Sequence, residues 1–144
     1  SIANGAPLEA LTLYDQAYLD LRDRIFKHLF DVYKHEINPI APVTEYLKED
    51  LMMVVMALHS IVMDMLRLQM SADTQSIVNC DCMDKLQWMA QHSDQISLHN
   101  LRTYLLKAQQ WLRGVTHLNP QLLLESLLIR WKQAYLQQEK IRAH

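Results

Sequence analysis

The sequence predicts an all-α protein, a bundle of about five to six helices. Apolar residues recur at helical spacings along most of the 144 residues, and no stretch alternates with period two. Helix start and stop signals divide the chain, the clearest being Asn119-Pro120, where Asn accepts from a free amide and Pro fits the first helical position. The length suits one domain with a sizeable core.

The first long helix is expected from about Asp15 to His35. The residues that mark its stripe are apolar except for one arginine: Leu19, Arg22, Phe26, Leu29, Phe30 and Tyr33. On its surface Asp20 could pair with Arg24, four residues further on. Asn38-Pro39 and Pro42 should end it, because proline disfavours helical geometry in the residue before it, and a short helix is expected at 42–48.

The second long helix is expected from about Asp50 to Met70, followed by a polar linker from Ser71 to Asn79. Its main face is uniformly apolar: Leu51, Val54, Val55, Leu58, Ile61, Val62, Met65 and Leu66. The longest uninterrupted apolar run, at 51–58, is far shorter than the about 20 residues of a membrane span. We therefore expect a soluble, cytoplasmic protein that does not enter a membrane.

Three more helices complete the bundle. Asp81 should cap a short helix through Met89, and Ser97 should cap a longer one that ends at about Arg113, before Gly114. The last helix starts at Pro120 and is expected to extend as far as Lys140. Its apolar face comprises Leu124, Leu127, Leu128, Trp131 and Tyr135. Leu122, Leu123 and Ile129 fall outside this face, which indicates a second neighbour that need not belong to this chain.

A second apolar line follows the helix at 50–70, through Met52, Met56, His59, Met63 and Met70. Two interpretations are open. The helix could be central and buried all round, or the line could be a partner surface, because methionine adapts to different binding partners. His59 is expected to be a hydrogen-bonded core or interface histidine and not a ligand or a base.

Composition and spacing argue against chemistry and direct nucleic-acid binding. With two glycines in the chain, neither a phosphate-binding P-loop nor a dinucleotide fingerprint can be built. A formal charge of −2 provides no basic field for phosphates. Cys80 and Cys82 stand closer together than the paired cysteines of zinc fingers, so we expect free thiols even with His92 and His99 downstream. No catalytic residue, metal, cofactor or small molecule is expected.

Three segments carry a family resemblance. The segment 119–131, after a turn at 114–118, resembles the final collar helix of bacterial clamp-loader subunits, most of all the delta-prime subunit of DNA polymerase III. The segment 3–11 resembles the end of that subunit's AAA+ lid domain, and 63–67 the middle of its collar domain. The resemblance implies a lid remnant at 1–14 and a helical collar domain at 15–144. Gly5 lacks the neighbouring Arg of the ATP-hydrolysing relatives, a departure that favours delta-prime.

The resemblance implies a non-catalytic oligomerisation domain within the bacterial DNA polymerase III holoenzyme, which is a DNA-directed DNA polymerase complex. Such domains assemble with the delta and gamma/tau collars, so that ATP binding elsewhere loads the sliding clamp during DNA replication. The residues predicted to form the subunit interface are Leu122, Leu123 and Ile129, with Met52, Met56 and Met63 as a second choice. The alternative is a stand-alone helical adaptor that homodimerises through the Met-rich line. A third possibility is a helical hydrolase that uses a metal at the histidines.

Overall fold

The computed structural model describes residues 8–71, 73–114 and 117–136, and these residues form an all-helical fold. The elements are α1 (Leu8–Lys34), α2 (Val43–Tyr46), α3 (Leu51–Met70), the 3₁₀ turn η2 (Cys80–Cys82), α4 (Met83–Gln91), α5 (Gln95–Arg113) and α6 (Pro120–Gln133). Within the described residues there are six α-helices and no strand, only an isolated bridge between Ser93 and Tyr135. The predicted fold class is confirmed.

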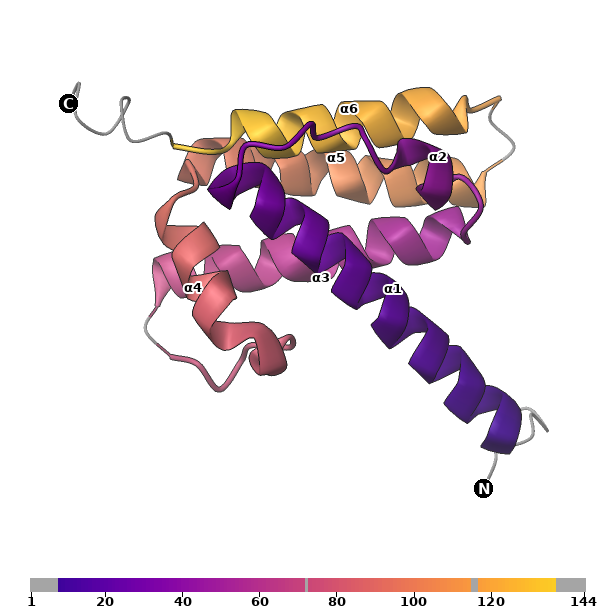
Figure 1. The fold of residues 1–144 in the computed structure, drawn as a ribbon, viewed down its shortest axis with the longest axis horizontal. Coiled ribbons are helices and arrows are strands. Elements are labelled where there is room, and N and C mark those ends of the chain that lie inside the picture. The colour runs from indigo at the N-terminus through magenta and orange to yellow at the C-terminus, as the bar shows by residue number, and fades with distance from the viewer. Residues whose placement is uncertain (1–7, 72, 115–116, 137–144) are drawn as a thin grey trace.

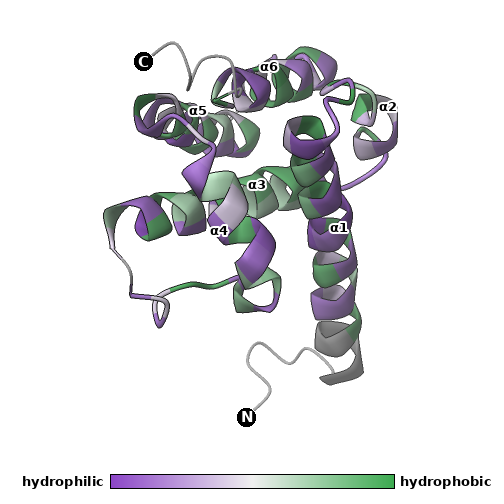
Figure 2. Cartoon of the chain, turned by 60° about the vertical axis from the view of Figure 1, so that its left-hand side comes forward, coloured by the Kyte–Doolittle hydropathy of each residue, from purple (hydrophilic) through white to green (hydrophobic). Residues whose placement is uncertain are grey.

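The centre of the bundle is α3, which packs against α1, α4 and α5 (Figure 1). On the far side of α5 lies α6, which also contacts α2 and α1. α1 crosses the bundle obliquely, and its N-terminal half projects beyond the other helices (Figures 1 and 2). The outward Leu13 and Tyr14 in this half are 71% and 55% exposed, as expected for a helix segment with no neighbour on most sides.

The central position of α3 follows from its composition. Asp50 caps it by accepting from the backbone N–H groups of Met52 and Met53, and its main apolar face is almost entirely buried. Figure 2 shows α3 as mostly hydrophobic, whereas hydrophobic and hydrophilic residues alternate along α1. By length and composition alone α3 could cross a membrane, but half of that stretch is buried among the other helices. Core helices of soluble proteins have the same character, so this carries no membrane assignment.

α1 is longer than predicted. It begins at Leu8 instead of about Asp15, so residues 8–14, expected to belong to a preceding domain, continue without a break into the first helix. It ends at Lys34, one residue before the predicted end. Glu36 adopts a φ of 52°, in the left-handed region, and turns the chain before Pro39. The domain boundary at 14/15 remains a prediction, and residues 1–7 lie outside the described part of the chain.

Two predicted caps are wrong. Asp81 lies within η2 and its carboxylate binds Arg22, while the cap position of α4 is Cys82, without a side-chain hydrogen bond. α5 starts two residues before Ser97, and Asp94 is its cap, accepting from the Ser97 backbone N–H at 2.9 Å. Asp and Ser are both good caps, so the local sequence did not discriminate between them.

The ends of α5 and α6 are also set by the fold. Gly114 follows α5 as predicted, but its φ of −93° is extended backbone, so the stop does not use glycine's left-handed freedom. α6 ends at Gln133 and not near Lys140. There the backbone pairs with the α4–α5 junction: Asp94 N donates to Ala134 O and Leu136 N donates to His92 O, both at 2.7 Å.

An aromatic cluster joins α1 to α6. The rings of Tyr33 and Trp131 stack at a centroid distance of 4.4 Å, and Tyr135 stacks on the same tyrosine at 4.5 Å. Trp131 Nε1 donates to Leu29 O at 3.1 Å, and the Tyr33 hydroxyl lies 2.8 Å from Ser93 Oγ. The buried indole and phenol therefore keep their hydrogen bonds inside the core, as such groups require.

Candidate subunit interface

The outer side of α6 carries an exposed stripe formed by Leu122, Ser126, Ile129 and Gln133, here called the α6 outer stripe. Leu122 is 62% exposed and Ile129 is 43% exposed, although both are large aliphatic side chains. At 100° per residue these four positions fall within about 60° of one another on the helix. With Glu125 and Arg130 they line a shallow depression of about 390 Å³. Two of the three predicted α6 interface residues are therefore on one accessible surface.

The third predicted interface residue, Leu123, does not lie on this accessible surface. Its side chain is only 3% exposed and belongs to the core, so its prediction as an outward residue is wrong. Leu123 precedes Leu127 by four residues, which places the two about 40° apart on the same side of the helix. α6 contacts α2 and α1 as well as α5, so part of the second neighbour that its apolar residues require comes from this chain.

The Met-rich line of α3 is a second partly exposed apolar surface, here called the Met face: Met52, Met56, His59, Met63 and Met70. Met56 is 46% exposed and Met70 is 69% exposed, while the other three are half-buried. The interpretation that this helix is buried all round is therefore wrong. A depression of about 340 Å³ overlies its middle, lined by Tyr18, Met56, His59, Ser60, Met63, Arg67, Val78 and Gln109.

His59 differs from expectation. Its Nε2 atom is buried and has no hydrogen-bond partner within the described residues. Burial lowers the pKa of His59 below its ordinary value, and the nearby positive charges of Arg102 and Arg67 lower it further. The imidazole is therefore neutral at pH 7 and its Nε2 is left without a partner, so the expectation of a fully hydrogen-bonded histidine is wrong for this atom.

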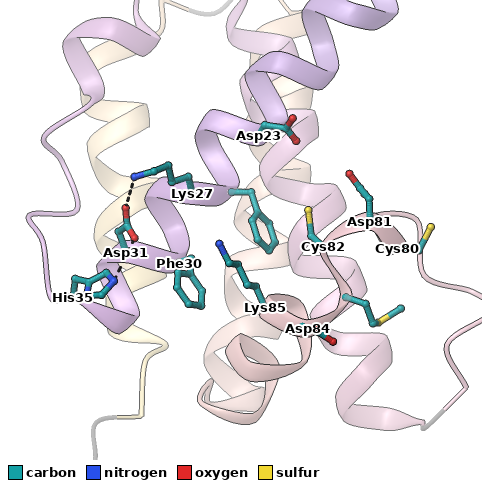
Figure 3. Close-up of a pocket in the computed structure, with 12 residues that line it drawn as sticks. Asp23, Lys27, Phe30, Asp31, His35, Cys80, Asp81, Cys82, Asp84 and Lys85 are labelled. Carbon is teal, nitrogen blue, oxygen red and sulfur yellow. Dashed lines mark hydrogen bonds and ion pairs between the residues drawn. The ribbon is translucent and has the colours of Figure 1, made fainter.

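A recess of about 690 Å³ lies between α1 and the η2–α4 segment (Figure 3). Its charges are mixed and largely paired: Lys27 Nζ binds Asp31 at 3.0 Å, and His35 approaches the same carboxylate at 3.9 Å. Lys85 Nζ lies 4.9 Å from the centre of the Phe30 ring. These contacts join α1 to α4 and assemble no nucleophile with a base.

Cys80 and Cys82 border this recess with Asp81 between them (Figure 3). Both are free thiols, and they lie in the 3₁₀ turn instead of an open linker. Burial and the neighbouring Asp81 carboxylate raise the pKa of Cys82, so its thiol is not activated. His92 Nδ1 lies 2.8 Å from Trp88 O and its ring stacks on that indole, while His99 is exposed elsewhere. In the described part of the chain no three His, Cys, Asp or Glu side chains group to hold a metal.

Sequence reasoning missed a buried polar network that fastens the α3–α4 segment to the bundle. Asp64, fully buried on α3, accepts from the backbone N–H groups of Val78 and Asn79, the Asn79 amide and Arg67 Nη1 at 2.7–3.0 Å. Asn79 Oδ1 accepts in turn from Arg22 Nη1 at 3.0 Å. The single carboxylate inside the apolar α3 was the available signal, because a buried charge requires partners.

Arg22, the charged member of the α1 stripe, is the other end of this network. Its guanidinium is buried and binds both carboxylate oxygens of Asp81, at 3.1 and 2.6 Å, as well as Asp23. The hydrogen bond from Arg22 holds the pKa of Asp81 below its usual range. On the same helix the predicted Asp20–Arg24 pair is wrong. Arg24 binds Glu49, in the turn before α3, at 2.6 Å instead.

The helices therefore define an all-helical domain with two partly exposed apolar surfaces and, among the described residues, no group of three metal-ligating side chains. The chain belongs to the family described as "DNA polymerase III, delta subunit, C terminal", whose model matches residues 16–133. It is the C-terminal domain of a clamp-loader component of the DNA polymerase III holoenzyme. No curated protein and no solved structure matches the chain. The resemblance to a clamp-loader subunit of DNA polymerase III is therefore confirmed for the family.

Proposed function

We propose that this chain is the collar domain of a delta-prime-type clamp-loader subunit, and that it does no chemistry of its own. In this proposal it assembles with the collars of the delta and gamma/tau subunits in the cytoplasm. It thereby holds the nucleotide-binding modules in order while the sliding clamp is loaded onto DNA. The delta-prime assignment is supported by the sequence at 3–11, where Gly5 is followed by Ala6-Pro7-Leu8 without an arginine.

The observation that carries the proposal is the α6 outer stripe. Leu122 and Ile129 are exposed on a well-packed helix whose opposite side is fully buried. Exposed apolar patches on soluble domains mark interaction surfaces, and a stable interface buries about 800 Å² per partner. Glu125 and Arg130 border the stripe, which matches an apolar centre with a polar rim. Met52, Met56 and Met63 of the Met face form the second candidate surface.

The test is a double substitution, Leu122→Asp plus Ile129→Asp, in place of one that includes the buried Leu123. Both side chains are exposed, so the variant should keep its far-UV circular dichroism and melting temperature. Native mass spectrometry should show that the wild-type chain enters a hetero-complex with the delta and gamma/tau C-terminal domains of the same organism, while the variant stays alone. Ile96→Asp, which adds an acid at another exposed apolar residue, is the matched control. A double variant that assembles as well as this control would overturn the α6 assignment.

The alternative function is a stand-alone adaptor that homodimerises through the Met face. Its supporting observation is the exposure of Met56 and Met70. The same mass spectra discriminate between the two functions. An adaptor would form a dimer whose fraction grows with protein concentration and that ignores the other collar domains, whereas a collar domain would join those domains in a defined complex.

A further inference from the structure

The Met face is flanked by two arginines whose charges are not balanced on the surface. Arg102 of α5 donates from Nε to Met63 Sδ at 3.0 Å, and this thioether is the one hydrogen-bond acceptor recorded for it in the described chain. Thioether sulfur is a weak acceptor, and a guanidinium has five N–H donors in a fork suited to carboxylates. Arg102 is half-buried and forms no ion pair within the described residues. Its position therefore favours an external carboxylate.

Arg67 lines the depression over Met56 and Met63. Its Nη1 binds Asp64 at 2.9 Å, and 37% of its side chain is exposed. Asp64 is the single carboxylate within α3 and is fully buried. None of the residues that line the depression is acidic. The rim of this apolar surface is therefore positive, although the whole chain has a formal charge of −2.

Close to both arginines, the buried Nε2 of His59 has no partner in the described structure. A buried polar atom without a hydrogen bond costs roughly 1–3 kcal/mol, so a ligand group or a water that reached it would be stabilised. Partly exposed methionines therefore lie beside the Arg102 guanidinium, whose acceptor is a weak one, and beside a buried histidine atom without a partner. An occupant with apolar and acidic side chains would suit the methionines and the guanidinium together.

We propose that the Met face binds an amphipathic helix of a partner protein, one whose apolar residues are flanked by aspartate or glutamate. Its apolar side chains would pack on Met56 and Met63, which adapt to varied shapes. Its carboxylates would accept from Arg102 and Arg67. This proposal rests on the proposed function in one respect, that the domain assembles with other proteins. It adds the kind of partner that the Met face would bind. A second copy of this chain is a poorer occupant, because it would bring another positive rim against the first.

The test uses the full chain with its methionine methyl groups labelled with ¹³C, and two synthetic helical peptides as probes. Both peptides carry leucines at i, i+3, i+4 and i+7; one has flanking glutamates and the other has lysines in their place. The glutamate peptide should shift the methyl signals of Met56 and Met63 and leave the fully buried Met65 and Met89 unchanged. The lysine peptide should bind about tenfold more weakly, because like charges oppose its docking.

Arg102→Gln should weaken binding of the glutamate peptide about two- to fivefold, the range for a partly exposed charge pair. Lys85→Gln, which removes the same charge from α4, should leave it unchanged. Equal binding of both peptides, no binding of either at millimolar concentration, or shifts elsewhere than Met56 and Met63 would overturn the proposal. A short single-stranded DNA, an oligothymidylate, tests phosphate as the ligand of the arginines. If it shifts the Met56 and Met63 signals more strongly than the glutamate peptide does, the proposal is also overturned. Assembly through the α6 outer stripe is measured separately, so the two proposals fail independently.

Discussion

Replacing Asp64 by alanine should be among the most destabilising single changes in this domain. The carboxylate is fully buried and accepts four hydrogen bonds, from Val78 N, Asn79 N, Asn79 Nδ2 and Arg67 Nη1. Asp64→Ala leaves the buried backbone N–H of Asn79 without a partner, leaves its side-chain amide with Ser60 Oγ alone, and removes the counter-charge of Arg67.

Removing one partner of a buried charged network costs about 3–5 kcal/mol, because the remaining groups stay desolvated and unpaired. A domain of this size has a total unfolding free energy of about 5–15 kcal/mol, so the loss would be a large part of it. Asp23→Ala is the matched control. Its carboxylate is 61% exposed, and Arg22 keeps its bonds to Asp81 and Asn79, so the cost should stay below about 1 kcal/mol.

Urea unfolding at pH 7, followed by far-UV circular dichroism and tryptophan fluorescence, measures both variants. The urea midpoint of Asp64→Ala should be much lower than that of the wild type, and the midpoint of Asp23→Ala should be nearly unchanged. If the two variants lost similar unfolding free energy, or if Asp64→Ala lost less than about 1 kcal/mol, the network would not be what holds the α3–α4 segment in place.

Three further predictions concern other parts of the molecule. Leu123→Asp should prevent folding, because the Leu123 side chain is only 3% exposed, whereas Leu122→Asp should leave the melting temperature almost unchanged. Equal melting temperatures for the two variants would contradict the difference in burial. Burial lowers the pKa of His28 and His59 below 6.5 in the folded protein. The unfolded chain therefore binds more protons than the folded protein, and the free energy of unfolding should fall as the pH decreases through about 6.5. NMR titration of both imidazoles measures their pKa values, and midpoints at or above 6.5 would refute this prediction. Gly114→Ala should stabilise the domain by about 0.4–1 kcal/mol in thermal unfolding, because a φ of −93° suits alanine; a lower melting temperature would count against it.

The candidate interface could be predicted only in part. Leu122 and Ile129 are on the predicted surface, because they lie opposite the buried Leu124 and Trp131 on the helical wheel. Leu123 is buried, and α6 contacts α1 and α2 as well as α5, neighbours that no local sequence signal indicates. The exposure of the Met face was left open for the same reason. Whether a central helix is covered on every side depends on how many helices surround it.

The sequence by itself determined the all-helical class, the presence of α3, and the start of α6 at Asn119-Pro120, because helical periodicity and capping act within a few residues. Only the tertiary structure decided that Arg22 and Asp81 pair across the bundle, and that α6 ends where Ala134 meets the α4–α5 junction. Such contacts join residues far apart in the chain, and their energies depend on burial. Local propensity therefore predicts where helices form, whereas packing determines which of their faces remain available to a partner.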